Sequence, residues 1–156
     1  MNRIDLIMRI PPPLLFVASF FGGVGMQRLL PLPLYPARLL PIGQAVGLVF
    51  IGGSALLMLS AVIVFVLART TIVPFSAAST LVVRGPYRFT RNPMYVGLAL
   101  AYLGAAIVLA FPWPLLFLPL PLALIQRVVI PFEEARLRQI FGDDFERYCL
   151  EVRRWL

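Results

Sequence analysis

The sequence predicts an all-α integral membrane protein with about four transmembrane helices, the last two paired as a hairpin and followed by a cytoplasmic amphipathic helical tail. Hydrophobic residues make up 60% of the chain and its mean hydropathy is +0.89, whereas soluble domains are about 45–50% apolar. Four stretches with few or no charges approach the roughly 20 residues that a helix needs to cross a bilayer. At 156 residues the chain is one domain by length.

The four apolar stretches follow one another closely. They cover residues 14–34, 42–68, 94–111 and 115–130, the last of which is interrupted by Arg127. The link Pro-Trp-Pro between the third and the fourth is short, so these two stretches should form an antiparallel hairpin. Two further prolines inside the fourth stretch predict a kinked helix.

The arginines predict how the chain is oriented. All fourteen basic residues are arginines. With four spans, twelve of them lie on the side that holds both termini and the loop of residues 69–93, and only Arg28 and Arg38 lie on the other side. Cytoplasmic loops of membrane proteins carry the excess of positive charge. We therefore expect a prokaryotic inner-membrane protein with cytoplasmic termini, whose arginines meet anionic lipid headgroups rather than nucleic acid.

The composition also excludes several classes of site. The chain has no histidine and a single cysteine, Cys149, which excludes an intrachain disulfide, a cysteine-built metal centre and histidine ligation. We expect no metal site. Glycines at residues 22–25 and 52–55 lie inside apolar spans rather than after a strand, so they indicate close helix packing and not a dinucleotide site.

The segment RGPYRFTRNPMYVG, residues 84–97, is unusually rich in polar and aromatic residue types for such an apolar chain. A purely structural interpretation is available: Asn92 caps a helix that begins at Pro93, and Gly85 and Pro86 form a tight turn. The arginines would then hold lipid phosphates and the aromatic rings would form an interfacial belt. The density of distinct residue types favours a binding site.

A second polar cluster, Glu133-Glu134, follows the fourth span. Ion pairs with Arg136 and Arg138 along a solvated helix face are the structural interpretation. Two adjacent carboxylates near a bilayer, however, need a cation beside at least one of them. Arg127 and a bound positive ligand are the two candidates.

The remaining tail reads as helix. Pro131 suits a first helical position, which places both glutamates in a first turn. Gly142 should break the helix, and Asp143 with Glu146 should form a capping box that restarts it. An apolar stripe at helical spacing could lie on the membrane or on the bundle. The stripe consists of Leu137, Phe141, Phe145, Tyr148 and Val152.

Two patterns then carry a family resemblance. The order L-V-x-x-G-P-Y-R-x-x-R-N-P-M-Y-x-G lies at residues 81–97, and E-E-x-x-L-x-x-x-F-G-x-x-F-x-x-Y-x-x-x-V-x-R-W at residues 133–155. Together they resemble the isoprenylcysteine carboxyl methyltransferase and phospholipid methyltransferase family. The resemblance covers the C-terminal half, so within a single domain of residues 1–156 we expect N-terminal spans at 1–80 and a cofactor-binding half at 81–156.

The resemblance implies an enzyme that transfers a methyl group from S-adenosylmethionine to a membrane-associated acceptor at the cytoplasmic face. The acceptor is a prenylcysteine-type carboxylate, or a lipid amine or thiol. Val83 and Gly85 would contribute through their backbone. The residues that the resemblance assigns to the cofactor are Val83, Gly85, Tyr87, Arg91, Asn92, Tyr95, Glu133 and Glu134.

Two residues are candidates for catalysis. Glu134 could take a proton from an amine acceptor, and Arg127, expected to be buried near the end of the fourth span, could bind an acceptor carboxylate or phosphate or pair with the glutamates. Many family members have histidine where this chain has Asn92, and an asparagine cannot titrate near neutrality, so a mechanism that needs an imidazole there is excluded. The alternative function is a non-enzymatic membrane scaffold or anionic-lipid-binding module; the sequence leaves the oligomeric state open.

Overall fold

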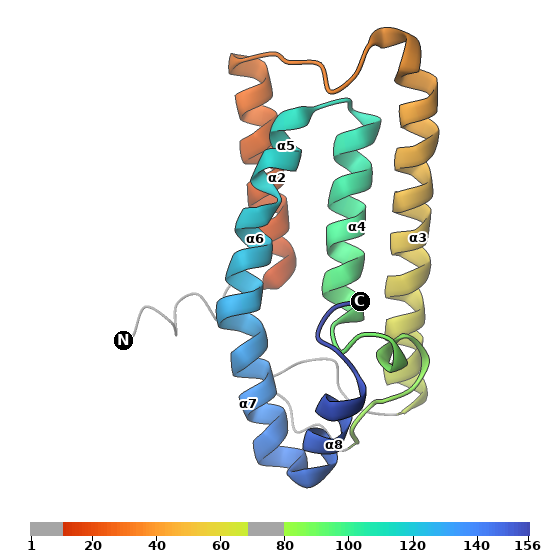
Figure 1. Cartoon of the computed structure of the whole chain (residues 1–156), viewed down its shortest axis with the longest axis vertical. Coiled ribbons are helices and arrows are strands. Elements are labelled where there is room, and N and C mark those ends of the chain that lie inside the picture. Colours follow the sequence, from red (N-terminus) through yellow and green to blue (C-terminus); the bar gives the residue numbers. More distant parts are fainter. Residues whose placement is uncertain (1–10, 69–79) are drawn as a thin grey trace.

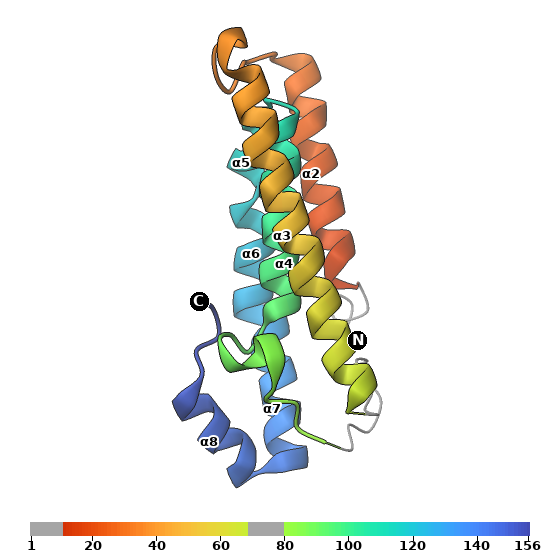
Figure 2. The same ribbon diagram turned by 90° about the vertical axis from the view of Figure 1, so that its right-hand side faces the viewer.

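The computed structural model describes residues 11–68 and 80–156, which contain helices and connecting segments and no strand. The long helices run along one common axis, as Figures 1 and 2 show. The prediction of an all-α protein is confirmed for the described residues. Their helices are α2 (Pro12–Leu29), η1 (Ala37–Leu39), α3 (Leu40–Leu67), η2 (Gly85–Arg88), α4 (Pro93–Val108), α5 (Pro112–Phe117), α6 (Pro119–Leu124), η3 (Ile125–Val129), α7 (Ile130–Phe141) and α8 (Asp143–Glu151).

Helices α3 and α4 form the tightest pair of the bundle because glycines let their backbones approach. A Cβ atom added to Gly104 would lie 2.7 Å from the carbonyl oxygen of Gly47, and one added to Gly47 would lie 2.7 Å from the carbonyl oxygen of Gly104. Seven residues along α3 from Gly47, the Ser54 hydroxyl donates a hydrogen bond of 2.7 Å to the Gly97 carbonyl of α4. Small residues at such a crossing maximise van der Waals contact between apolar helices.

In each of the two stretches predicted to pack closely, one small residue makes the contact: Gly23 in the first and Ser54 in the second. A Cβ atom on Gly23 would lie 2.6 Å from the Cα atom of Pro114, so α2 and α5 meet there. Among the described residues, in contrast, no atom lies within 4 Å of the corresponding position of Gly52 or Gly53. Their face of α3 is open, and the contact with α4 is made through Ser54 instead.

The predicted fourth span is longer than the sequence indicated. Residues Pro112–Phe141 form one helical run, so Pro112 begins a helix instead of lying in a link. The chain reverses before it, where Ala110 has φ +56°. Helix α5 ends at Phe117 and α6 begins at Pro119, so the run is interrupted where the sequence predicts a kink. Pro131 lies in the first turn of α7 together with Glu133, as expected, although α7 continues the run instead of standing apart from it.

Just before Pro131 the run changes its hydrogen-bond pattern. The segment η3 has π-helical geometry, and the Ile130 amide bonds to the Ile125 carbonyl five residues back. Pro131 has no amide hydrogen and therefore cannot serve the Arg127 carbonyl four residues before it. A single π-turn is a common way to accommodate such a defect inside an α-helix.

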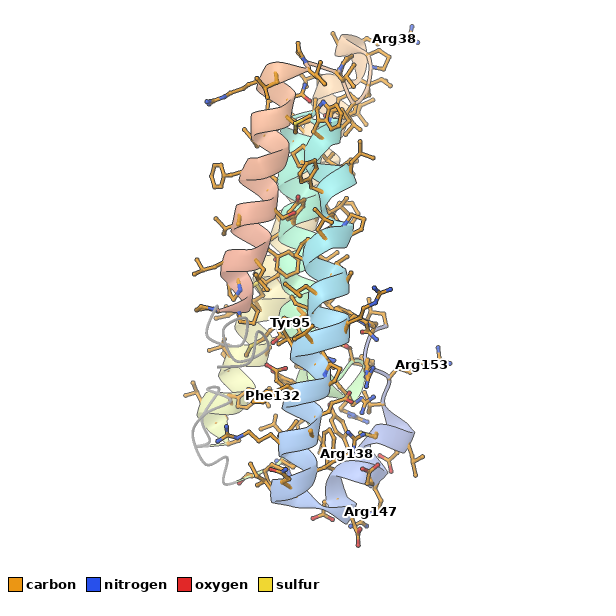
Figure 3. The ribbon with its side chains drawn as sticks, turned by 90° about the vertical axis from the view of Figure 1, so that its left-hand side faces the viewer. Arg38, Tyr95, Phe132, Arg138, Arg147 and Arg153 are labelled. Carbon is orange, nitrogen blue, oxygen red and sulfur yellow. The ribbon has the colours of Figure 1, made fainter. Side chains whose placement is uncertain are left out.

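Two helical runs among the described residues are long and apolar enough to cross a membrane: Ala37–Leu67, with 31 residues, and Pro112–Phe141, with 30. Helix α4 is a shorter apolar helix. Arginines lie towards both ends of the bundle. Figure 3 shows Arg38 at one end and Arg138, Arg147 and Arg153 towards the other. The four-span topology remains a prediction.

The tail folds back on the bundle. Gly142, with φ +51°, separates α7 from α8, as expected for a helix break. The predicted capping box is wrong: Gly142 is the N-cap residue, no side chain caps α8, and Glu146 instead accepts a hydrogen bond of 2.6 Å from Arg138. The apolar stripe of the tail packs on the protein, since buried Phe145 and Tyr148 contact Leu81.

Candidate functional site

The two sequence motifs meet around a cavity of about 360 Å³. It lies where α3, α4, α7 and α8 come together at the arginine-rich end of the bundle, and its walls are mainly apolar. Its size falls in the range of about 300–1,000 Å³ that is usual for small-molecule sites. Of the eight residues predicted to bind the cofactor, those lining this cavity are Tyr87, Arg91, Asn92, Tyr95, Glu133 and Glu134.

A hydrogen bond between Tyr95 and Glu133 connects the two motifs. The Tyr95 hydroxyl, on the first turn of α4, donates to Glu133 Oε1 at 2.7 Å, and Glu133 belongs to α7. Glu133 forms no ion pair within residues 11–68 and 80–156. A pocket-lining carboxylate with one neutral donor is suited to receive a positively charged ligand group.

Glu134 has a different environment, because arginines surround its carboxylate. Arg154 donates from Nε to Oε1 at 2.8 Å and from Nη2 to Oε2 at 2.6 Å, which is a bidentate pair. Arg91 Nη2 lies 3.4 Å from Oε1, and Arg138 Nη1 lies 3.9 Å from Oε2. The Glu134 side chain is only 6% exposed. Three guanidinium groups therefore surround this buried carboxylate beside the cavity.

The backbone of the C-terminal residues docks on the loop that precedes α4. The Arg91 amide donates to the Arg153 carbonyl at 2.9 Å, and the Thr90 hydroxyl donates to the Arg154 carbonyl at 2.8 Å. The Asn92 side-chain amide donates to the same carbonyl of Arg154 at 3.0 Å. Asn92 is the N-cap residue of α4 by position, but its side chain does not cap the helix. The prediction of side-chain capping was wrong because the Arg154 carbonyl takes the amide.

The loop before α4 is held by buried aromatic residues. The Tyr148 hydroxyl of α8 donates to the Tyr87 carbonyl at 2.7 Å, and the Tyr87 ring packs edge-to-face on Phe65 of α3. Burial raises the pKa of both tyrosines, so their hydroxyls stay protonated donors near neutral pH. Helix η2 and Tyr87 thus form a rigid wall of the cavity.

Val83 and Gly85, predicted to bind the cofactor through their backbone, are exposed and do not line the cavity. Gly85 begins η2 with φ +59°, a conformation that residues with a Cβ atom rarely adopt. A Cβ atom at this position would also lie 2.7 Å from Cγ2 of Val64. In this structure Gly85 therefore shapes the loop that carries Tyr87.

Arg91 lies at the centre of the polar contacts. Besides Glu134, its Nη1 atom donates to Cys149 Sγ, and its Nε atom is buried without a hydrogen-bond partner among the described residues. Burial raises the pKa of the Cys149 thiol, while Arg91 opposes that shift. Cys149 is therefore a neutral thiol near pH 7. The guanidinium of Arg91 keeps donor capacity for a ligand in the cavity.

Arg127 was expected to be buried and available to the glutamates, and the structure corrects this. Its side chain is exposed on η3, outside the cavity lining, and among the described residues it forms no ion pair with Glu133 or Glu134. The sequence-based assignment missed Arg154, which occupies that role. The only signal in the sequence was the R-W pair that ends the second pattern.

The described residues contain no group of three or more side chains suited to hold a metal ion. The positive and negative groups at the cavity instead pair with one another or face the cavity. Its chemistry is that of a largely apolar chamber whose polar lining residues include two glutamates, two arginines and three tyrosines: Glu133, Glu134, Arg91, Arg136, Tyr87, Tyr95 and Tyr148.

Comparison with known proteins agrees with the family resemblance of the two sequence patterns at residues 81–97 and 133–155. Two proteins named probable protein-S-isoprenylcysteine O-methyltransferase, from Oryza sativa subsp. indica and subsp. japonica, are each 35% identical over 72 residues. The aligned part covers 46% of this chain and 38% of each relative, so the chain spans well under half of their length. No solved structure matches. The model of the phospholipid methyltransferase family matches residues 42–144, two thirds of the chain, and the protein belongs to that family.

Proposed function

We propose that this protein transfers a methyl group from S-adenosylmethionine to a membrane-associated acceptor at the cytoplasmic face. The acceptor is a prenylcysteine-type carboxylate, or a lipid amine or thiol. Family membership indicates a methyltransferase. The observation that supports the donor is the cavity itself, where the hydrogen-bonded pair Tyr95 and Glu133 closes the polar end of a chamber of suitable size.

The groups at the cavity complement the charges of S-adenosylmethionine. The donor carries an ammonium, a carboxylate, a sulfonium and an adenosine. Glu133, which has no ion pair in the described part of the chain, suits the ammonium. Arg91 suits the carboxylate, because charge-assisted hydrogen bonds from a guanidinium are strong. The faces of Tyr87 and Tyr95 attract a sulfonium through their π-electrons.

The reaction needs little acid–base chemistry. A lone pair of the acceptor oxygen, nitrogen or sulfur forms a bond to the methyl carbon while the bond from that carbon to the sulfonium breaks, and its electrons return to sulfur. The products are the methylated acceptor and neutral-sulfur S-adenosylhomocysteine. The protein contributes an in-line arrangement of the two reactants and a chamber that excludes water.

An amine acceptor would also have to lose a proton. The sequence makes Glu134 a candidate for this step, but its carboxylate is occupied by Arg154 and approached by two further arginines. Such contacts stabilise the ionised form and make a carboxylate a poor base. Glu133 is then the better proton acceptor at the cavity, and Glu134 has a supporting role.

The membrane arrangement follows from helix lengths. The run Pro112–Phe141 has 30 residues and is about 45 Å long at 1.5 Å per residue, whereas the hydrocarbon core is about 30 Å thick. One end must therefore protrude. The end with Glu133 and Glu134 is the charged one, and the arginine-rich side is cytoplasmic by the positive-inside rule. We infer four spans in this orientation, with a cavity open to the cytosolic donor.

Calorimetric titration of the purified protein in detergent with S-adenosylmethionine tests the donor. We expect binding by the wild-type protein and a loss of affinity of about tenfold or more in Glu133→Gln, the effect of one charged hydrogen bond. Glu151→Gln is the matched control, since that residue is exposed and lies outside the cavity lining. A folded wild-type protein that does not bind the donor, or equal affinities in the two variants, would refute the proposal.

The acceptor is tested separately with the radiolabelled donor. Transfer is measured to a prenylated cysteine with a free carboxylate, to phosphatidylethanolamine vesicles and to a lipophilic thiol. Activity on one class and not on the others identifies the acceptor. Donor binding without transfer to any membrane-associated acceptor, or transfer only to water-soluble acceptors, would contradict the acceptor part of the proposal.

A further inference from the structure

Residues 152–155, which we call the strap, dock on the loop before α4 beside the cavity. We propose that Arg154 of this strap is a positioning residue for donor binding: it engages Glu134 and so keeps the Arg91 guanidinium available to the carboxylate of the donor. This inference rests on the proposed function and adds to it a residue that contacts neither donor nor acceptor.

Arg154 contacts Glu134 more closely than Arg91 does. Arg154 reaches both oxygens of Glu134, at 2.8 and 2.6 Å, whereas Arg91 reaches one oxygen at 3.4 Å. A bidentate guanidinium–carboxylate pair is the stronger and more directional contact. Arg154 is therefore the main counter-ion of Glu134, and Arg91 is a secondary partner.

Arg154 is held in place by hydrogen bonds to its own backbone carbonyl. Its carbonyl accepts hydrogen bonds from the Thr90 hydroxyl at 2.8 Å and from the Asn92 amide at 3.0 Å. The neighbouring Trp155 ring nitrogen donates to Gln126 Oε1 at 2.6 Å. The strap thus connects the loop before α4 with the helical run of residues 112–141.

Arg91 lines the cavity and has a buried Nε atom without a hydrogen-bond partner among the described residues. Glu134 is only 6% exposed and needs a close cation. If Arg154 is removed, the nearest guanidinium is that of Arg91. It would then close its 3.4 Å gap and become the main counter-ion, because an unpaired buried carboxylate is costly. Arg91 would no longer be available to a ligand carboxylate.

A pair of ligands separates this role from a general structural one. S-adenosylmethionine carries the carboxylate that Arg91 would bind, and decarboxylated S-adenosylmethionine lacks it but keeps the ammonium, the sulfonium and the adenosine. In wild-type protein we expect the complete donor to bind more tightly by about tenfold, the contribution of one charge-assisted hydrogen bond. In Arg154→Gln we expect that preference to disappear while the affinity for the decarboxylated analogue is unchanged.

The experiment measures both dissociation constants by calorimetry on the full chain in detergent, together with the unfolding temperature. Arg154→Lys keeps the charge and one contact, so it should restore part of the preference. Arg153→Gln is the matched control, because the Arg153 side chain is exposed and only its carbonyl is used. It should behave as the wild type. If Arg154→Gln does not fold, the measurement is made on Arg154→Lys, in which a reduced preference supports the role.

Three results would overturn the inference. One is an Arg154 variant that keeps the full preference for the complete donor. Another is an equal loss of affinity for both ligands, which indicates a structural role only. The third is a loss of preference in Arg153→Gln as well. All three require wild-type protein that binds the donor, whereas absence of wild-type binding refutes the proposed function itself, so the two failures are distinguishable.

Discussion

The crossing of α3 and α4 should not tolerate a single added methyl group at Gly104. In Gly104→Ala the new Cβ atom would lie 2.7 Å from the Gly47 carbonyl oxygen and 3.0 Å from the Ile51 amide nitrogen. Both are backbone atoms of the neighbouring helix, so no side-chain rotation can relieve the contact and the helices must separate. Overpacking of this kind costs about 1–3 kcal/mol, against a gain of up to about 1 kcal/mol from better helix propensity.

The matched control is Gly52→Ala on the open face of α3, where a Cβ atom meets nothing within 4 Å. Both substitutions gain the same helix propensity, so the difference between them isolates the packing cost of about 1–3 kcal/mol. Reversible unfolding of the two variants in the same detergent measures that difference. Equal stabilities, or a Gly104 variant that is more stable than the Gly52 variant, would refute the close crossing of α3 and α4.

Two further predictions concern the tail. Tyr148→Phe removes the buried hydrogen bond to the Tyr87 carbonyl, so the unfolding free energy should fall by about 1–3 kcal/mol; an unchanged unfolding curve would contradict that contact. Cys149 should react slowly with maleimide at pH 7.5, because burial raises the pKa of its thiol and the reactive thiolate is scarce until the pH approaches that raised pKa. The rate should rise with pH and increase on denaturation; a rate in the folded protein equal to that of a free cysteine peptide would contradict the burial.

Much of the helical organisation could be predicted because it depends on local composition. The charge-free stretch of residues 42–68 became α3, Leu40–Leu67, and the stretch of residues 94–111 became α4, Pro93–Val108. Pro119 was correctly expected to interrupt the fourth stretch. The start of that helix at Pro112 and its continuation through Pro131 were missed, since proline marks both helix starts and interior kinks and only the neighbouring backbone decides between them.

The meeting of the two motifs could also be predicted, because a helical hairpin returns Glu133 to the level of Tyr95. The hydrogen-bond and ion-pair partners of the residues inside the site could not be predicted. Asn92 has the sequence context of a helix cap, but its amide bonds to the Arg154 carbonyl, 62 residues away in the chain. Arg127 is closer in sequence to Glu134 than Arg154 is, yet it lies on another side of the helical run. Such choices depend on tertiary contacts that local patterns do not encode.

The π-helical segment η3 changes the direction in which the later side chains of the helical run point. An α-helix turns about 100° per residue, so a turn that contains one extra residue shifts every later side chain by roughly that angle relative to a regular count. Residues counted from Leu122 at a 3.6-residue period would therefore place Glu133 about a quarter of a turn away from its observed direction towards Tyr95. The π-helical segment thus places one extra residue between the apolar half of the helical run and its acidic half.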